Sequence, residues 1–338
     1  MPVGINPQIP EVKMIVVQTP LRISFLGGGT DFEDYYRLNG GGAVLTTAIN
    51  KHTFVIVKER FDDMIYVNYS RKEIVERVED LQHELIREAM KLTGVTKGVE
   101  ITTLADIPSE GTGLGSSSSI LVGLLLALHT YQGDSATAET LAREACQIEI
   151  DTLHKPIGKQ DQYISAYGNM RFITFKTSGI TLDKLDICDK GKQRFDEHLL
   201  LFYTGRTRQA DPILAEQRSN IGETRPLLEE MTKLAYRGKD VLSEQAFYEF
   251  GELLHEGWNI KKQFASRVTN SEIDDMYQTA RKAGAIGGKI AGAGGGGFML
   301  FCCPPAKRDD IRASLHGLKE FPFRSYCDGS KVIFNYRN

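Results

Sequence analysis

The chain has 338 residues, enough for one large or two medium domains that each bury a hydrophobic core. Hydrophobic residues make up 41% and charged residues 25%, ordinary globular values that exclude a disordered or fibrous chain. The 41 basic and 44 acidic side chains nearly balance and form no block of one sign, which argues against binding to nucleic acid or to a membrane surface.

The cysteines and the apolar runs favour a cytoplasmic protein. The five cysteines include the adjacent pair Cys302–Cys303 and fit neither a disulfide framework nor a CxxC metal site, so we expect reduced thiols. The longest apolar run, Ile120–Leu128, is too short to span a bilayer. Residues 1–12 carry three prolines and no signal-peptide pattern, so we expect a flexible arm and no export.

The order of the predicted elements indicates two domains. The polar stretch 188–198 predicts a junction between an N-terminal domain over 13–190 and a C-terminal domain over 191–338. The N-terminal elements are predicted strands at 13–26, 43–61, 64–70 and 98–108, a helix at 83–93 closed by Gly94, and helices after 115 and over 137–153. The second half is helix-rich between 223 and 283 and returns to strands at 289–303 and 331–336.

A glycine- and serine-rich loop, "PSEGTGLGSSSS", precedes a helix that is apolar on every side. Such a helix must be buried, and its start then leaves N–H groups unpaired and carries a partial positive charge. Gly111, Gly113 and Gly115 allow the backbone to fold closely around a ligand, and Ser116–Ser119 add hydroxyls that cap the helix or reach a metal ion. A phosphate chain fits this site; the alternative is a self-contained, serine-capped helix. The loop is not a Walker A motif, because no GK[ST] follows at the required spacing.

A second glycine loop lies in the other half of the chain. Gly292, Gly294 and Gly297 satisfy GxGxxG literally, but the strand-like run "FMLFCC" follows instead of the helix that a dinucleotide fold requires. We therefore exclude the Rossmann interpretation and expect this loop to pack closely against the first loop or its ligand. A mobile hairpin is the alternative.

Helical periodicity places a carboxylate in an apolar stripe. At 100° per residue, Glu149 falls between Ile148, Ala145 and Leu153 on the apolar face of the helix over 137–153. A buried carboxylate is costly unless it meets a cation, so we expect a metal ion or a basic partner there. A structural arginine or a water pocket is the alternative. Magnesium is the natural metal, since it takes few protein oxygens, and Ser117 or a neighbour can supply a second one.

Two further charged residues are ambiguous from their local sequence. Asp161 stands at the start of a short predicted helix ended by Gly168, where it fits an ordinary helix N-terminal carboxylate. Arg22 lies in a strand among apolar neighbours, shortly before Asp31, and these residues alone favour a simple ion pair between Arg22 and Asp31.

Taken together, the motifs resemble one family, the galactokinase, homoserine kinase, mevalonate kinase and phosphomevalonate kinase superfamily, or GHMP kinases. The segments "TPLRISFLGGGTDF", "PSEGTGLGSSSSI" and "KIAGAGGGGFMLF" are similar to its three motifs, and the resemblance spans residues 13–338. It implies an α+β, two-domain GHMP kinase fold: an N-terminal ribosomal-protein-S5-domain-2-like α/β domain with a left-handed crossover, and a C-terminal ferredoxin-like α+β domain. "PLRISF" with "GGGTD" and "IGKQDQY" most resemble the members that phosphorylate D-glycero-D-manno-heptose 7-phosphate at the anomeric hydroxyl.

The resemblance implies an ATP-dependent sugar kinase that uses Mg²⁺. Asp161 matches the catalytic base, Arg22 the residue that favours the deprotonated nucleophile, and Ser117 and Glu149 the magnesium ligands. The implied ATP-binding residues are Gly111, Gly113, Leu114, Gly115, Ser116, Ser117, Ser118, Gly292, Gly294 and Gly295. The implied sugar-binding residues are Gly28, Gly29, Thr30 and Asp31, and the basic candidates for the sugar phosphate are Lys159, Arg206 and Arg208.

Two departures from the family pattern concern the turn before Asp161 and the choice of substrate. The spacing from Glu149 to Asp161 is one residue longer than in mevalonate kinases. Galactokinases carry Glu–His where Gly28–Gly29 stand here, which argues against galactose. The alternatives to a heptose-phosphate kinase are another anomeric kinase such as an L-fucokinase, and a non-enzymatic sensor of sugar and nucleotide. We expect small-molecule partners only and a monomer or homodimer.

Overall fold

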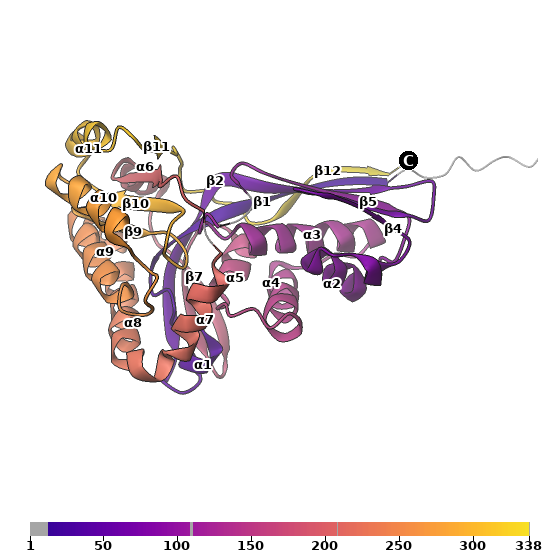
Figure 1. Cartoon of the computed structure of the whole chain (residues 1–338), viewed down its shortest axis with the longest axis horizontal. Helices are drawn as coiled ribbons and strands as arrows, with labels where there is room; N and C mark the ends of the chain where they lie inside the picture. The colour runs from indigo at the N-terminus through magenta and orange to yellow at the C-terminus, as the bar shows by residue number, and fades with distance from the viewer. Residues whose placement is uncertain (1–12, 109–110, 208, 338) are drawn as a thin grey trace, which may run out of the picture.

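The computed structural model describes residues 13–108, 111–207 and 209–337. It has two β-sheets with helices packed against them (Figure 1). The larger sheet and helices α2, α3 and α4 extend to the right of Figure 1, and helices α8, α9 and α10 lie at the left. Helices α9 and α10 pack on the smaller sheet, whereas α8 packs on α9 and on β1 and β2 of the larger sheet. The predicted arm at residues 1–12 lies outside the described residues.

The first sheet has eight strands in the order β12-β1-β2-β5-β3-β4, with β6 paired to β2 and β7 paired to β6. All pairs are antiparallel except β3 with β5. Its strands are β1 (Lys13–Leu26), β2 (Gly42–Glu59), β3 (Ile65–Asn68), β4 (Lys72–Val75), β5 (Val99–Ala105), β6 (Met170–Lys176), β7 (Gly179–Lys184) and β12 (Lys331–Arg337). The strands predicted from β-branched composition are confirmed.

Helix α3 is the buried helix that its all-apolar sequence predicts. It runs over Ser116–Gln132 and packs against β1 and β2. The other helices of this half are α1 (Glu33–Tyr36), the 3₁₀ turn Val78–Asp80, α2 (Glu84–Thr93), α4 (Ala138–Cys146), a π-helix over Gln147–Thr152, and α5 (Gln160–Tyr167). Gly94 ends α2 in the left-handed conformation, as predicted.

The second sheet is four-stranded and antiparallel, in the order β11-β8-β10-β9. Its strands are β8 (Leu199–Tyr203), β9 (Gly287–Ile290), β10 (Phe298–Cys302) and β11 (Lys319–Glu320). The helices are α6 (Asp189–Glu197), α7 (Asp211–Ser219), α8 (Ile221–Ser243), α9 (Phe247–Lys261), α10 (Ser271–Lys282), the 3₁₀ turn Pro305–Lys307 and α11 (Arg308–Ser314). Strands and helices therefore alternate irregularly, as in an α+β domain.

The polar stretch 188–198 forms helix α6 and not a loop. The Cys188 sulfur accepts a hydrogen bond from the Gly191 N–H at the start of α6, and Phe195 buries one face of the helix. Phe195 makes edge-on contacts with Phe25 of β1 and Phe250 of α9, with ring centroids 5.5 and 5.1 Å away. The two halves therefore share an apolar contact at this point.

The division of the chain at residue 190 stays a prediction. The last strand, β12, pairs with β1 over Lys13–Gln18, so the end of the chain returns to the first sheet.

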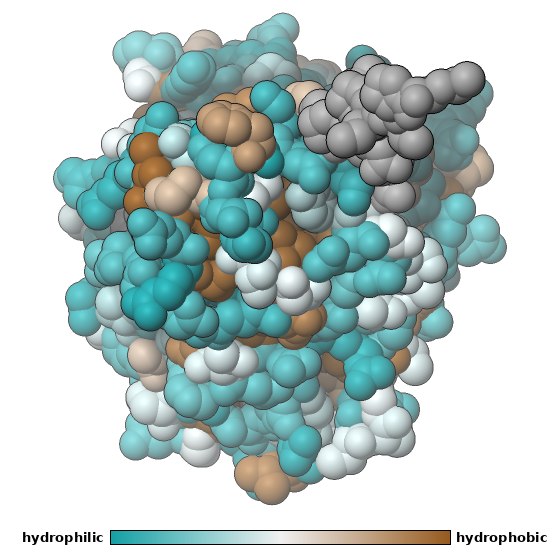
Figure 2. Space-filling model, turned by 90° about the vertical axis from the view of Figure 1, so that its right-hand side faces the viewer, coloured by the Kyte–Doolittle hydropathy of each residue, from teal (hydrophilic) through white to brown (hydrophobic). Residues whose placement is uncertain are grey.

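None of the helices among the described residues is long and apolar enough to cross a membrane. Figure 2 shows the face at the β12 end of the molecule, where hydrophilic residues dominate and hydrophobic residues appear in small groups between them.

The two glycine loops pack directly against each other. A Cβ added to Gly113 would lie 2.3 Å from the carbonyl oxygen of Ala291, and one added to Gly297 would lie 2.3 Å from that of Thr112. The Phe298 N–H also donates to the Thr112 carbonyl, at 3.3 Å. The prediction that the second loop packs closely against the first is confirmed, since only glycine leaves room for this approach.

We predict that Gly113→Ala destabilises the protein far more than Gly40→Ala. Both glycines have similar positive φ angles, +80° and +75°, but a Cβ at Gly40 meets nothing within 4 Å. Thermal unfolding should show a loss of about 1–2 kcal/mol for Gly40→Ala, from backbone strain alone. It should show a clearly larger loss for Gly113→Ala, together with weaker ATP binding. Equal losses for the two variants would contradict the loop packing.

Candidate active site

The first glycine loop ends at the start of helix α3. Gly111, Gly113 and Gly115 have φ angles of +72°, +80° and +75°, which only glycine adopts readily. Gly115 is the N-cap residue of α3, and no described side chain caps the helix. The alternative, a start of α3 capped by a serine side chain, is therefore wrong. The amides of the first turn keep the arrangement that favours an anion.

The four serines of the first turn differ in their hydrogen bonds. Ser117 and Ser118 donate hydrogen bonds to Glu149, and Ser119 donates to the carbonyls of Thr19 and Pro20 on β1. The Ser116 hydroxyl is buried without a hydrogen-bond partner among the described residues. Ser119 therefore anchors the helix to the sheet, whereas Ser117 and Ser118 face the carboxylate that periodicity predicted to be buried.

Glu149 lies in the π-helix that continues α4 and is 1% exposed. Its Oε2 accepts hydrogen bonds from Ser118 Oγ at 2.7 Å and Gln162 Nε2 at 2.6 Å, and its Oε1 accepts one from Ser117 Oγ at 3.2 Å. Burial, with a smaller contribution from the charge of Asp161, raises the pKa of Glu149. The alternative of an arginine partner is wrong, because all of these hydrogen-bond donors are neutral.

The donor set at Glu149 fits a magnesium ion. The carboxylate and the Ser117 hydroxyl are hard oxygen donors, and Mg²⁺ takes one or two carboxylates and leaves its other positions to water and phosphates. Among the described residues no group of three or more His, Cys, Asp or Glu side chains can hold a metal by itself. A cation here would therefore take its remaining ligands from water or from the phosphates of a nucleotide.

Asp161 and Arg22 form a bidentate ion pair beside the glycine loop. Arg22 Nε donates to Asp161 Oδ1 at 2.7 Å, and Nη2 donates to Oδ2 at 2.6 Å. Arg22 Nη1 donates to the carbonyl of Gly113 at 2.6 Å. A Cβ at Gly115 would lie 3.3 Å from Asp161 Oδ2 and 3.1 Å from Arg22 Cγ, so the loop passes directly over the pair. The Arg22–Asp31 pair favoured by local sequence is wrong.

Asp31 is instead bound by backbone amides. It is 2% exposed and accepts hydrogen bonds from the N–H groups of Gly29 and Gln160, at 3.1 and 3.2 Å. Burial and the charge of Asp161 raise its pKa. A Cβ at Gly158 would lie 2.0 Å from Asp31 Oδ2, so a glycine is required there. Asp31 thus ties the loop after β1 to the start of α5, which carries Asp161.

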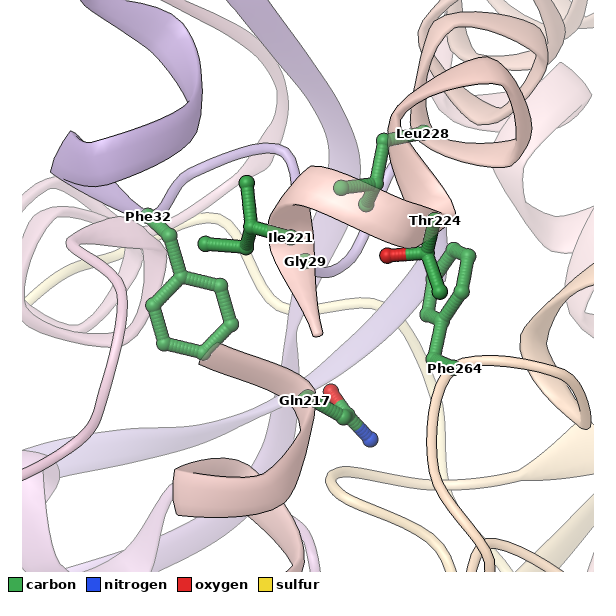
Figure 3. Close-up of a pocket in the computed structure, with 7 residues that line it drawn as sticks. All are labelled: Gly29, Phe32, Gln217, Ile221, Thr224, Leu228 and Phe264. Carbon is green, nitrogen blue, oxygen red and sulfur yellow. The ribbon is translucent and has the colours of Figure 1, made fainter. Parts of the chain in front are cut away.

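The remaining predicted sugar-binding residues differ in what they contact. The Thr30 hydroxyl is fully buried and donates to the carbonyls of Gly27 and Ala43, so it is already used within the fold. Gly28 lies close to Gln160, since a Cβ on it would be 3.9 Å from Gln160 Nε2. Gly29 lines a pocket, named here the Gly29 pocket. Figure 3 shows Phe32 and Phe264 on either side of this pocket, with Gln217 of α7 and with Ile221 and Leu228 of α8.

The basic candidates do not share one site. Lys159 pairs with Glu33 of α1 at 2.7 Å, whereas Arg206 is exposed and pairs with Glu272 of α10 at 2.5 Å. The Arg206 carbonyl accepts the N–H of Gly297, which places this segment beside the second glycine loop. Arg208 lies outside the described residues. Lys159 and Arg206 therefore face different elements.

Two buried lysines beside the second glycine loop were missed as functional candidates. Lys289 is 5% exposed, and its Nζ donates to the carbonyls of Ser24 and Phe25 on β1, at 2.8 Å each. Burial, and the charges of Lys261 and Arg22, lower its pKa well below the usual range. Lys261 donates to the carbonyl of Gly292. The position of Lys289 inside the otherwise uncharged run "GGKIAGA" was the sequence feature that could have indicated its burial.

The fold and the site define a phosphotransferase with a phosphate-binding helix start, a buried carboxylate and an arginine-paired aspartate. Two family models match the chain: the GHMP kinases N-terminal domain at residues 72–169 and the GHMP kinases C-terminal domain at 239–318. The chain belongs to the GHMP kinase family, has its two-domain fold, and is an ATP-dependent kinase. The fold class and the enzyme class predicted from the motifs are confirmed.

Individual relatives include sugar kinases. The chain is 29% identical to D-glycero-alpha-D-manno-heptose 7-phosphate kinase of Campylobacter jejuni, over 90% of this chain and 94% of the relative. It is 24% identical to the bifunctional fucokinase/GDP-fucose pyrophosphorylase of Arabidopsis thaliana, over 92% of this chain and 32% of the relative. A solved D-glycero-D-manno-heptose 1-phosphate kinase from Bacteriodes thetaiotaomicron has a TM-score of 0.79 at 23% identity, over 95% of this chain and 99% of the other.

We predict that Glu149→Gln stabilises the protein when no divalent cation or nucleotide is present. Because the pKa of Glu149 is raised in the folded chain, folded-state stability falls as pH rises from the unfolded pKa through the folded one, and the full cost is present once the carboxyl has ionised. The glutamine side chain of the variant keeps the shape without this buried charge. Thermal unfolding above that pH should show a Tm increase of a few degrees.

The same variant should respond less to magnesium and nucleotide. We expect Mg²⁺ with a non-hydrolysable ATP analogue to raise the Tm of the original protein well above that of Glu149→Gln. Asp151→Asn, two residues along the same π-helix but exposed, is the control and should behave like the original protein. The assignment of Glu149 fails if the magnesium-dependent shift is the same in all three proteins.

Proposed function

We propose that the enzyme transfers the γ-phosphoryl group of ATP to the anomeric hydroxyl of D-glycero-D-manno-heptose 7-phosphate, giving the 1,7-bisphosphate for nucleotide-activated heptose synthesis. The observation that carries this proposal is the Arg22–Asp161 pair, which lies between the phosphate loop at Gly115 and the segment Gly28–Asp31. The Campylobacter jejuni relative, matched over 90% of this chain, supports the choice of acceptor.

Asp161 is the proposed base for the acceptor hydroxyl. The hydroxyl oxygen attacks the γ-phosphorus, the bond from that phosphorus to the bridging oxygen breaks, ADP leaves, and the hydroxyl proton passes to the Asp161 carboxylate. Arg22 holds this carboxylate by two parallel hydrogen bonds and fixes its orientation. The Asp161 side chain is 22% exposed, which leaves room for a substrate hydroxyl to reach it.

Residues of the two glycine loops are the proposed nucleotide contacts. The first-turn amides of α3 and the left-handed glycines at 111, 113 and 115 favour the triphosphate, and Gly292, Gly294 and Gly295 of the second loop also have positive φ angles. Glu149 and Ser117 would hold Mg²⁺, which neutralises phosphate charge when bound. The other residues of the two loops would orient the nucleotide and the acceptor relative to each other.

Acceptor specificity tests the proposal directly. ADP release should be measured with D-glycero-D-manno-heptose 7-phosphate, the unphosphorylated heptose, L-fucose and mevalonate at equal concentrations. We expect the highest kcat/KM with the heptose phosphate and a product phosphorylated at C1. The fucokinase relative makes L-fucose the second candidate. A preference for L-fucose or mevalonate would overturn the proposal. A cytoplasmic location and a monomeric or homodimeric state stay predictions.

We predict that Asp161→Asn lowers kcat by about 10²–10⁴-fold and barely changes the Kd for ATP. The amide cannot accept the hydroxyl proton, but the loop amides that contact the triphosphate are untouched. Arg22, which is 5% exposed, loses its carboxylate partner, so the Tm should fall and kinetics should be measured well below it. A parallel loss of kcat and of ATP affinity would remove Asp161 from the role of base.

A further inference from the structure

A second pocket, named here the Lys159 pocket, lies beside the sugar-binding segment. Its charged lining is Glu33 and Asp34 of α1, Lys159 at the start of α5, and Arg218 of α7, with Phe32 and two isoleucines as its apolar wall. Phe32 also lines the Gly29 pocket, so the two pockets adjoin. Phe32 follows Asp31 directly, so the proposed sugar-binding segment leads into the Lys159 pocket.

The basic side chains of this pocket are held by two carboxylates. Lys159 Nζ lies 2.7 Å from Glu33 Oε2, and Arg37 Nη2 lies 2.5 Å from Glu33 Oε1. Arg218 Nε pairs with Asp34. The pocket lining therefore contains two cations and two carboxylates, and Arg37, which lies outside the lining, adds a third cation beside Glu33. The hydrogen bond from Lys159 lowers the pKa of Glu33, so this carboxylate is ionised at neutral pH.

These ion pairs can exchange a carboxylate for another anion. The side chains of Arg218 and Asp34 are 43% and 50% exposed, and exposed ion pairs contribute little to stability, so their exchange costs little. A phosphate group offers more acceptor oxygens and more negative charge than a carboxylate, and arginine and lysine together bind it well.

The position of Lys159 suits an acceptor with an anion at its far end. Lys159 precedes the first turn of α5, which carries Asp161, and the Gln160 N–H between them binds Asp31. A sugar with its reacting hydroxyl at Asp161 and its ring along Gly28–Asp31 would point its other end past Phe32.

From this arrangement we propose that the Lys159 pocket is the subsite for the terminal phosphate of the acceptor, with Lys159 and Arg218 as its ligands and Asp34 as the anion that the phosphate displaces. The inference rests on the proposed function and adds to it a named specificity site. It replaces Arg206 by Arg218 as the second basic ligand.

Paired acceptors test the subsite. KM and kcat should be measured for D-glycero-D-manno-heptose 7-phosphate and for the unphosphorylated heptose with Arg218→Gln. Loss of a charge-assisted hydrogen bond should raise KM for the phosphorylated acceptor by about tenfold or more. We expect kcat and the KM for the unphosphorylated heptose to stay within about twofold, because Arg218 does not contact the reacting atoms. Arg225→Gln, a similarly exposed arginine on α8 that pairs with Glu229, is the control and should change neither KM.

For Asp34→Asn we expect a change in KM opposite to that of Arg218→Gln, and a loss of folding would not produce such a change. It removes the competing carboxylate, so KM for the phosphorylated acceptor should fall severalfold. The subsite assignment is overturned if Arg218→Gln changes both acceptors equally or neither, while the original protein still prefers the heptose phosphate. If the original protein does not use the heptose phosphate at all, the proposed function fails, and the subsite fails with it.

Discussion

The buried guanidinium of Arg22 is the interaction on which the site depends. A buried cation must be fully paired, and Arg22 uses its side chain for Asp161 of α5 and for the Gly113 carbonyl, and its backbone N–H for the Leu114 carbonyl at 3.0 Å. One residue of β1 therefore fixes the positions of a helix start and of the phosphate loop relative to each other. The planar fork of arginine suits this, whereas lysine cannot pair bidentately.

Three carboxylates lie close enough to interact at this site, each in a different environment. Asp161 is paired with Arg22, Asp31 is bound by backbone amides, and Glu149 is bound by hydroxyls and an amide side chain. The charge of Asp161 raises the pKa of both of the others, so the site carries mutual repulsion that a bound cation would relieve. These environments suit three different proposed roles: Asp161 as the base, Asp31 as a positioning group and Glu149 as a metal ligand.

Local sequence patterns predicted most of the helices and strands, but they could not predict contacts between residues that are far apart in the sequence. The strand at 13–26 follows from its β-branched composition and the burial of Glu149 from helical periodicity, and both signals depend only on nearby residues. The partner of Arg22 cannot be predicted from local sequence, because Asp161 is 139 residues away whereas the wrongly favoured Asp31 is only nine residues away. Helix α6 was missed because its sequence is polar except at Phe195, whose contacts come from distant elements. The roles that periodicity left open are those that the resemblance to a known family implies, and they stay proposals.

A crystal structure with Mg²⁺, a non-hydrolysable ATP analogue and the heptose phosphate tests the central claim most directly. We expect the terminal phosphate at the start of α3, within reach of the Gly115 and Ser116 amides, and the anomeric hydroxyl within hydrogen-bond distance of Asp161 while Asp161 remains paired with Arg22. A nucleotide bound away from this loop, or an acceptor hydroxyl remote from Asp161, would contradict it.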